Sequence, residues 1–155
     1  MPPNSQVMGD LDATVAWAAK TREANPSKLA ITGFCWDGRI VWLYAAHNPN
    51  VKAGAAWYGP VIGQKDELRR KSVLDLAPEM KPPVIGFYGG KDQGIPVDRV
   101  EQLRAALKAA HKPCGISIYP DAQHGFNADY RPSYNETGAK EACAKMLVWF
   151  HKHDA

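Results

Sequence analysis

In the first third of the chain, the pattern of apolar residues typical of a helix alternates with the pattern typical of a strand. From Ser5 to about Glu23 they recur every three or four residues, which predicts an amphipathic helix. The segment Leu29 to Phe34 then has the length and the apolar start of a buried strand. Ile40 to Ala46 is apolar nearly all round, which predicts a helix buried on every side. A helix, a strand and a helix therefore follow one another here.

The same alternation continues to the last residues. Strands are predicted at three further places, namely Val51 to Tyr58, Val84 to Tyr88 and Gly115 to Tyr119. A helical stripe follows the third predicted strand of the chain, at Val100, Leu103, Leu107 and Ala110. The polar, proline-punctuated segment Gly63 to Pro82 predicts only a short helix within a long connection.

The last predicted helix has a recognisable start. Ser133-Tyr134-Asn135-Glu136 has the S-x-x-E form of a capping box, in which the serine caps the helix. Its inner face is expected to carry Ala139, Cys143, Met146 and Phe150. Helix and strand thus alternate from end to end, which predicts an α/β fold with a partial parallel sheet of about four strands and helices on both faces.

Size and charge limit the function classes. The 155 residues fit one domain, residues 1–155. The net charge of +3 is spread along the chain, so no nucleic-acid partner is expected, and Arg69-Arg70-Lys71, the one basic cluster, is expected to be a solvated loop or helix end. No segment has the pattern of a signal peptide or membrane span, which predicts a cytoplasmic protein without a membrane partner.

Cys35 is the first candidate for chemistry. It follows a predicted strand and precedes a predicted helix, within Gly33-Phe34-Cys35-Trp36-Asp37-Gly38. Such a strand-turn-helix elbow lifts a nucleophile above the sheet, and the start of a helix favours a thiolate. The alternative is that Cys35 is a small buried apolar residue. The other cysteines, Cys114 and Cys143, form no CxxC pair with it, so neither zinc nor a disulfide framework is indicated.

Two more strand ends carry titratable groups. Asp92 follows the third predicted strand, and His124 follows the fourth. The order nucleophile, acid, base is the chain order of triads on an α/β-hydrolase sheet, in which the imidazole takes a proton and the carboxylate orients it. Each residue also has a simpler interpretation: Asp92 as a turn residue that bonds its own backbone, and His124 as a loop histidine. The coincidence of all three at one sheet edge favours an enzyme.

Four blocks of the sequence resemble one family over nearly the whole chain. The blocks are Gly33-Phe34-Cys35-Trp36-Asp37-Gly38-Arg39, Trp57-Tyr58-Gly59, Phe87-Tyr88-Gly89-Gly90-Lys91-Asp92 through Ile95-Pro96, and Tyr119 through His124-Gly125-Phe126. They look like those of dienelactone hydrolase, or carboxymethylenebutenolidase. The resemblance implies a three-layer α/β-hydrolase-like fold and a hydrolase of small lactones or esters that needs no cofactor and no metal. It implies Cys35 as nucleophile, His124 as base and Asp92 as orienting acid, with the backbone N–H of Trp36 holding the oxyanion.

The chain departs from the family pattern within the site. Asp37 stands where the family has a glycine, so we expect its carboxylate to disfavour the thiolate and its side chain to crowd helix against strand. Ala128 stands where members specific for dienelactone carry an arginine, and Arg131 is nearby but not equivalent. The resemblance therefore implies a small ester or lactone substrate other than the natural dienelactone.

The resemblance covers the C-terminal two-thirds of a dienelactone hydrolase. Family members have further strands before the helix that begins here near Ser5, and these supply a second oxyanion donor. Without them the strand Leu29 to Phe34 is an edge, so we expect a homo-oligomer formed through that edge. The alternative function is a catalytically silent fragment that survives as a folded or partner-completed module. A nucleotide-binding α/β domain is disfavoured, because neither GxGxxG nor GxxxxGK[ST] is present.

Overall fold

A computed structural model describes residues 2–21, 24–63 and 71–155. The chain forms one four-stranded parallel sheet, in the order β1 (Ala30–Phe34), β2 (Ala53–Trp57), β3 (Val84–Gly89) and β4 (Gly115–Tyr119). The predicted α/β class and parallel sheet are confirmed. Strands β2 and β3 are buried along their whole length, as expected of central strands covered on both faces.

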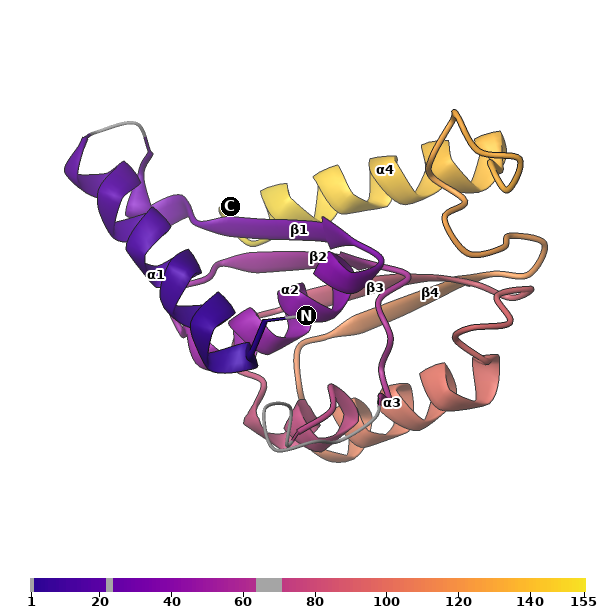
Figure 1. The fold of residues 1–155 in the computed structure, drawn as a ribbon, viewed down its shortest axis with the longest axis horizontal. Coiled ribbons are helices and arrows are strands. Elements are labelled where there is room, and N and C mark those ends of the chain that lie inside the picture. Colours follow the sequence, from indigo (N-terminus) through magenta and orange to yellow (C-terminus); the bar gives the residue numbers. More distant parts are fainter. Residues whose placement is uncertain (1, 22–23, 64–70) are drawn as a thin grey trace.

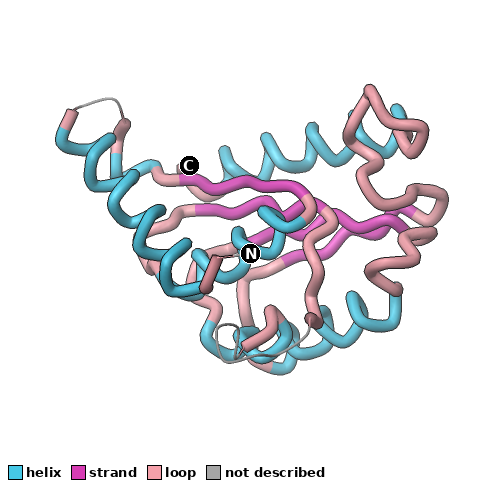
Figure 2. Tube along the Cα trace, in the orientation of Figure 1, coloured by secondary structure: helices cyan, strands magenta, loops and turns pink. Residues whose placement is uncertain are grey.

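The helices form one layer on each face of the sheet (Figures 1 and 2). Helix α4 (Glu136–Lys152) covers one face, and α1 (Asn4–Lys20), α2 (Trp36–His47) and α3 (Val97–Ala109) lie on the other. Short 3-10 turns precede β1 at Pro26–Lys28 and β3 at Leu74–Glu79. The second of these is the short helix expected in the long connection. Arg69 and Arg70 of the basic cluster lie outside the described residues.

Two boundaries differ from the sequence prediction. Helix α2 begins at Trp36, directly after Cys35, and not at Ile40. Gly38 lies so close to β2 that a Cβ atom on it would be 2.4 Å from the carbonyl oxygen of Trp57. The helix can therefore start against the sheet only because its third residue has no side chain.

The capping-box prediction for α4 is wrong in its capping residue. The side chain of Asn135, not that of Ser133, accepts a hydrogen bond from the backbone N–H of Gly138 (2.8 Å), and the helix begins at Glu136. The chain before it belongs to the preceding loop, because the N–H of Tyr134 donates to the carbonyl of Arg131. The helix cap thus lies two residues later than the S-x-x-E pattern indicates.

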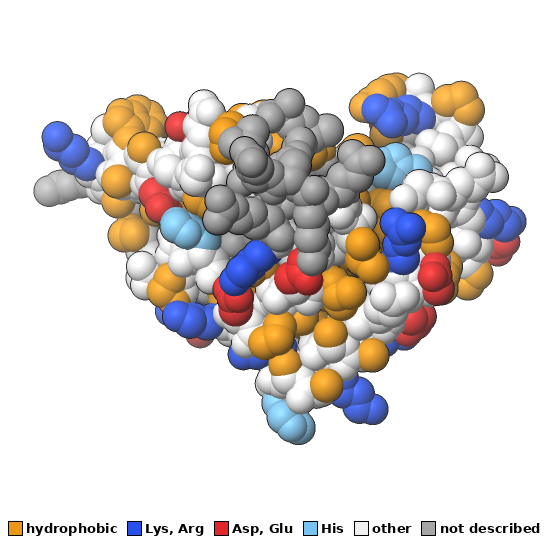
Figure 3. Space-filling model, turned by 60° about the horizontal axis from the view of Figure 1, so that its bottom comes forward, with side chains coloured by type: hydrophobic (Ala, Val, Ile, Leu, Met, Phe, Trp, Pro, Cys, Tyr) orange, Lys and Arg blue, Asp and Glu red, His pale blue; other side chains and the backbone are white. Residues whose placement is uncertain are grey.

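Large buried side chains pack between the sheet and both helix layers. The indole N–H of Trp42 on α2 donates to the hydroxyl of Tyr88 on β3 (3.1 Å), so this polar pair is satisfied inside the core. A second, smaller cluster joins α1 to α2 around Met8 and Leu43. On the face shown in Figure 3, lysine and arginine side chains lie among aspartate and glutamate side chains. No helix in the described part of the chain is long and apolar enough to cross a membrane.

Candidate active site

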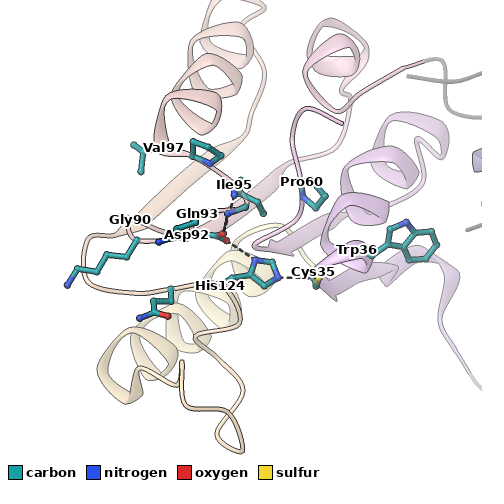
Figure 4. Close-up of a pocket in the computed structure, with 13 residues that line it drawn as sticks. Cys35, Trp36, Pro60, Gly90, Asp92, Gln93, Ile95, Val97 and His124 are labelled. Atoms are coloured by element: carbon teal, nitrogen blue, oxygen red, sulfur yellow. Dashed lines mark hydrogen bonds and ion pairs between the residues drawn. The ribbon is translucent and has the colours of Figure 1, made fainter. Parts of the chain in front are cut away.

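The carboxyl ends of three of the four strands bring the three predicted site residues together. Cys35 follows β1, Asp92 lies in the loop after β3 and His124 in the loop after β4. The Nε2 atom of His124 lies 3.2 Å from the Cys35 sulfur, and its Nδ1 atom lies 2.7 Å from Oδ2 of Asp92. Figure 4 shows the imidazole between the two other side chains. The three predicted residues therefore lie together at the carboxyl end of the sheet, as expected from their positions after the strands.

The backbone holds Cys35 in the conformation of an elbow. Its φ of 56° is in the left-handed region, which costs a non-glycine residue free energy. Its N–H donates to the carbonyl of Trp57 on β2 (2.9 Å), which fixes the turn to the neighbouring strand. The thiol is exposed, so the interpretation of Cys35 as a small buried apolar residue is wrong.

Asp92 combines the turn role and the site role. Its Oδ1 atom accepts hydrogen bonds from the N–H groups of Gly94 (2.9 Å) and Ile95 (3.1 Å), as a turn aspartate does. Its Oδ2 atom remains for His124, and the residue is only 6% exposed. The turn therefore fixes the carboxylate that orients the imidazole. An ionised carboxylate only accepts hydrogen bonds, so the Nδ1 atom of His124 carries a proton.

The surroundings of His124 favour its protonated form. The hydrogen bond that His124 donates to Asp92 raises the pKa of the imidazole most, burial opposes this, and the contact with Cys35 raises it further, so that the pKa is about 9. At neutral pH the ring therefore carries protons on both nitrogens and faces the sulfur with an N–H group. A protonated imidazole in this position has a proton that it can donate to a leaving group.

Two cavities meet at Cys35. The larger has a volume of about 1170 Å³ and is lined by Trp36, Pro60, Ile95 and Gln123 as well as by the three site residues. In Figure 4 the Trp36 indole points away from His124, which leaves the backbone of α2's first turn near the sulfur. The smaller cavity, of about 280 Å³, lies on the side of Tyr58 and Arg131. A group bound to the sulfur can thus extend in two directions.

Tyr58 is a site residue to which the sequence reasoning assigned no role. Its ring lies edge-on to the His124 imidazole, with 5.1 Å between the ring centroids, and it is 4% exposed. Its position in the sequence could have indicated a role, because Tyr58 directly follows β2. The end of β2 was the one strand end to which no titratable group had been assigned. Asp37, in contrast, lies in the first turn of α2 and is exposed. Among the described residues no cluster of side chains has the make-up of a metal site.

Comparison with known proteins places this geometry in one family. Residues 2–154 match the dienelactone hydrolase family. A candidate carboxymethylenebutenolidase of Methylorubrum extorquens is 51% identical over 97% of this chain and 52% of its own length, and one of Escherichia coli is 48% identical over 97% and 55%. The crystal structure of a candidate dienelactone hydrolase from Klebsiella pneumoniae superposes with a TM-score of 0.93 at 50% identity, over 97% of this chain and 62% of that one.

The matches cover nearly all of this chain but only part of its relatives. The chain spans about half the length of the two named relatives, and nearly all of its own residues take part in each match. Its sheet and helix layers are those of an α/β-hydrolase-like fold. The order of the strands, the turn at Cys35 and the sequence identity all support the same family assignment. The chain belongs to the dienelactone hydrolase family.

Proposed function

We propose that the chain is a cysteine-dependent hydrolase of small lactones or carboxylic esters. In this proposal Cys35 is the nucleophile, His124 the general base and acid, and Asp92 the residue that orients the imidazole. The observation that carries it is the imidazole that bridges the exposed thiol, at 3.2 Å, and the buried carboxylate, at 2.7 Å. The names of the relatives support an ester or lactone as substrate.

In the first half of the proposed reaction a thioester forms. The Cys35 thiolate attacks the carbonyl carbon, a C–S bond forms, and the π electron pair moves to the carbonyl oxygen. The N–H of Trp36 would hold that oxygen, because the first N–H groups of a helix have no partner within it and carry its positive end. The electron pair on the carbonyl oxygen then re-forms the C=O bond, the ester C–O bond breaks, and His124 gives its Nε2 proton to the departing oxygen.

In the second half water releases the acyl group. The neutral imidazole of His124 takes a proton from a water molecule, whose oxygen attacks the thioester carbon. The new C–O bond forms, the C–S bond breaks and the electron pair returns to sulfur. The products are a carboxylic acid and an alcohol, joined in one hydroxy acid when the substrate is a lactone. The thiolate and imidazolium of Cys35 and His124 are thereby restored.

Hydrolysis of a small activated ester by three variants tests the proposal. We expect Cys35→Ala and His124→Ala to lose nearly all activity, on the order of a thousandfold or more. Cys114→Ala is the matched control, because Cys114 lies in another part of the molecule against the carbonyl of Pro82, and it should keep the wild-type rate. Each variant is first checked for a cooperative thermal transition.

The alternative function, a catalytically silent module, predicts another result. If wild type, Cys35→Ala and His124→Ala hydrolyse the ester at the same residual rate, the site does no chemistry. A thioester trapped on Cys35 by acid quenching and seen by intact mass would exclude that outcome directly.

We also propose that the chain self-associates through β1. This strand is an edge of the sheet, and Phe34 at its end is 41% exposed. Since the N–H of Cys35 donates towards β2, the alternation of a strand directs the N–H of Thr32 outwards. At the opposite edge the guanidinium of Arg104 donates to the carbonyl of Ile116 (3.2 Å), so that edge is partly covered.

Sedimentation at increasing protein concentration tests the self-association. Wild type should form dimers, and Thr32→Pro should stay monomeric, because proline removes the outward N–H. Thr32→Val, which keeps that N–H, is the control and should dimerise. Proline and valine at this position both lack the hydroxyl that donates to the Ala55 carbonyl on β2 (3.0 Å), so the loss of that bond is common to the variant and its control. A wild-type protein that remains monomeric at high micromolar concentration would contradict the proposal.

A further inference from the structure

Cys35 and Tyr58 share an unusual backbone conformation. Among the described residues, the non-glycine residues with positive φ are Cys35 (56°), Tyr58 (37°), His111 (52°) and Asp154 (57°). The last two directly follow the caps of α3 and α4, where a left-handed residue is ordinary. Cys35 and Tyr58 instead follow the paired residues Phe34 and Trp57 of β1 and β2. The two strained residues are therefore neighbours across the sheet, at the site itself.

The Tyr58 side chain is fixed by aromatic contacts. Its ring lies edge-on to His124, at 5.1 Å between centroids, and to Phe126, at 5.5 Å, and it contacts Phe34 at 6.1 Å. The backbone is fixed too, since the Tyr58 N–H donates to the carbonyl of Phe87 (2.7 Å). A tyrosine held in this way on three sides keeps its hydroxyl in one place.

The hydroxyl of Tyr58 is available to a bound molecule. Tyr58 lines the smaller cavity together with Cys35, and within the described part of the chain its hydroxyl makes no hydrogen bond. Burial raises the pKa of Tyr58 to about 12, opposed by Arg131 and supported by Cys35. The group therefore keeps its proton over the working range of an imidazole and thiol, and remains a donor.

On the function proposed above, we propose that the Tyr58 hydroxyl donates a hydrogen bond to the substrate carbonyl oxygen as it gains negative charge during attack by Cys35. It would act together with the N–H of Trp36, because Cys35 lies where the cavity lined by Trp36 meets the cavity lined by Tyr58. A carbonyl carbon bonded to the sulfur holds its oxygen next to Cys35. Two tyrosines line the smaller cavity there, Tyr58 and Tyr130; Tyr58 is buried against the imidazole, whereas Tyr130 is 79% exposed. A donor fixed before the reaction stabilises the oxyanion without having to reorganise.

Tyr58→Phe tests this role because it removes the hydroxyl and keeps the ring contacts. We expect kcat/KM for a small activated ester to fall about a hundredfold, with kcat falling in parallel. Alkylation of Cys35 by iodoacetamide should proceed at the wild-type rate, because displacement of iodide at a saturated carbon creates no oxyanion. Tyr134→Phe, on the loop before α4 and outside both cavities, is the control and should match wild type in both assays.

The two assays separate the possible failures. An unchanged kcat/KM in Tyr58→Phe would overturn the inference and leave the proposed function intact. A fall in hydrolysis matched by an equal fall in alkylation would overturn it as well, since the hydroxyl would then act on the sulfur or on the fold. Equal rates in wild type and Cys35→Ala would instead overturn the proposed function itself.

Discussion

Gly33 and Asp37 touch each other across the turn that carries Cys35. A Cβ atom on Gly33 would lie 2.7 Å from the Asp37 carbonyl oxygen and 2.9 Å from the Asp37 Cβ atom. The first turn of α2 can approach β1 this closely only because position 33 has no side chain. The crowding expected from Asp37 thus falls on Gly33, while the Asp37 side chain itself is exposed.

Replacing Gly33 with alanine should therefore push α2 away from β1. We expect Gly33→Ala to lower the free energy of unfolding by about 1–3 kcal/mol, the usual cost of an overpacked contact, and to slow ester hydrolysis by displacing Cys35. Urea unfolding measures the first effect. Gly9→Ala in α1 is the control: nothing lies within 4 Å of its added Cβ, so it should stabilise by about 0.5–1 kcal/mol. Equal effects of the two substitutions would contradict this account.

Asp92→Asn should separate the two roles of that side chain. The amide keeps an oxygen for the N–H groups of Gly94 and Ile95, so the turn should persist. It cannot support a charged imidazole, and we expect kcat to fall by about a thousand- to ten-thousandfold. The measurement is ester hydrolysis, with urea unfolding to verify the fold.

A nearby carboxylate provides the control for Asp92. Asp121 pairs with Lys91 (2.8 Å) in the neighbouring loop, and its side chain is 81% exposed. Asp121→Asn removes the same charge without reaching His124, so activity should stay at the wild-type level. If both variants lose activity equally, a general loss of negative charge, and not the orientation of the imidazole, explains the result.

The raised pKa of His124 should make stability depend on pH. A group whose pKa rises from its ordinary 6.5 to about 9 on folding stabilises the fold fully below pH 6.5, and this contribution is lost as the pH rises through 9. The free energy of unfolding of wild type minus that of His124→Gln should therefore be larger at about pH 6 than at about pH 10. The side chain is 35% exposed, so solvent screening reduces the size of the effect. If the difference in the free energy of unfolding between wild type and His124→Gln is the same at about pH 6 and about pH 10, the raised pKa of His124 does not contribute to stability.

The site could be predicted from the sequence because its members follow strands. Parallel strands end at one edge, so placing Cys35, Asp92 and His124 directly after strands was enough to bring them together. The role of Tyr58 could not be predicted in this way. Its significance lies in its backbone conformation and its contact with the imidazole, and neither is visible in a pattern of apolar and polar residues.

Helix starts were predicted less well than strand ends, for a physical reason. The start of α2 depends on the close approach of Gly38 to Trp57, a tertiary contact between distant residues. The start of α4 depends on a loop whose own hydrogen bonds extend to Asn135, since the N–H of that residue donates to the carbonyl of Phe126 (2.9 Å). A capping motif states which residues can cap a helix, but the surrounding chain decides which one does.

The three cysteines should differ sharply in reactivity, because their surroundings differ. Cys35 is exposed beside His124, whereas burial raises the pKa of Cys114 to about 11. With limiting iodoacetamide at neutral pH, peptide mass spectrometry should find the label first on Cys35, and on Cys114 only near pH 11 or after unfolding. His124→Gln should slow labelling of Cys35 and leave Cys143 unchanged, which separates the effect of the imidazole from that of exposure. Identical pH profiles for Cys35 and Cys114 would mean that the imidazole does not activate the thiol, and the nucleophile would then have to be sought elsewhere.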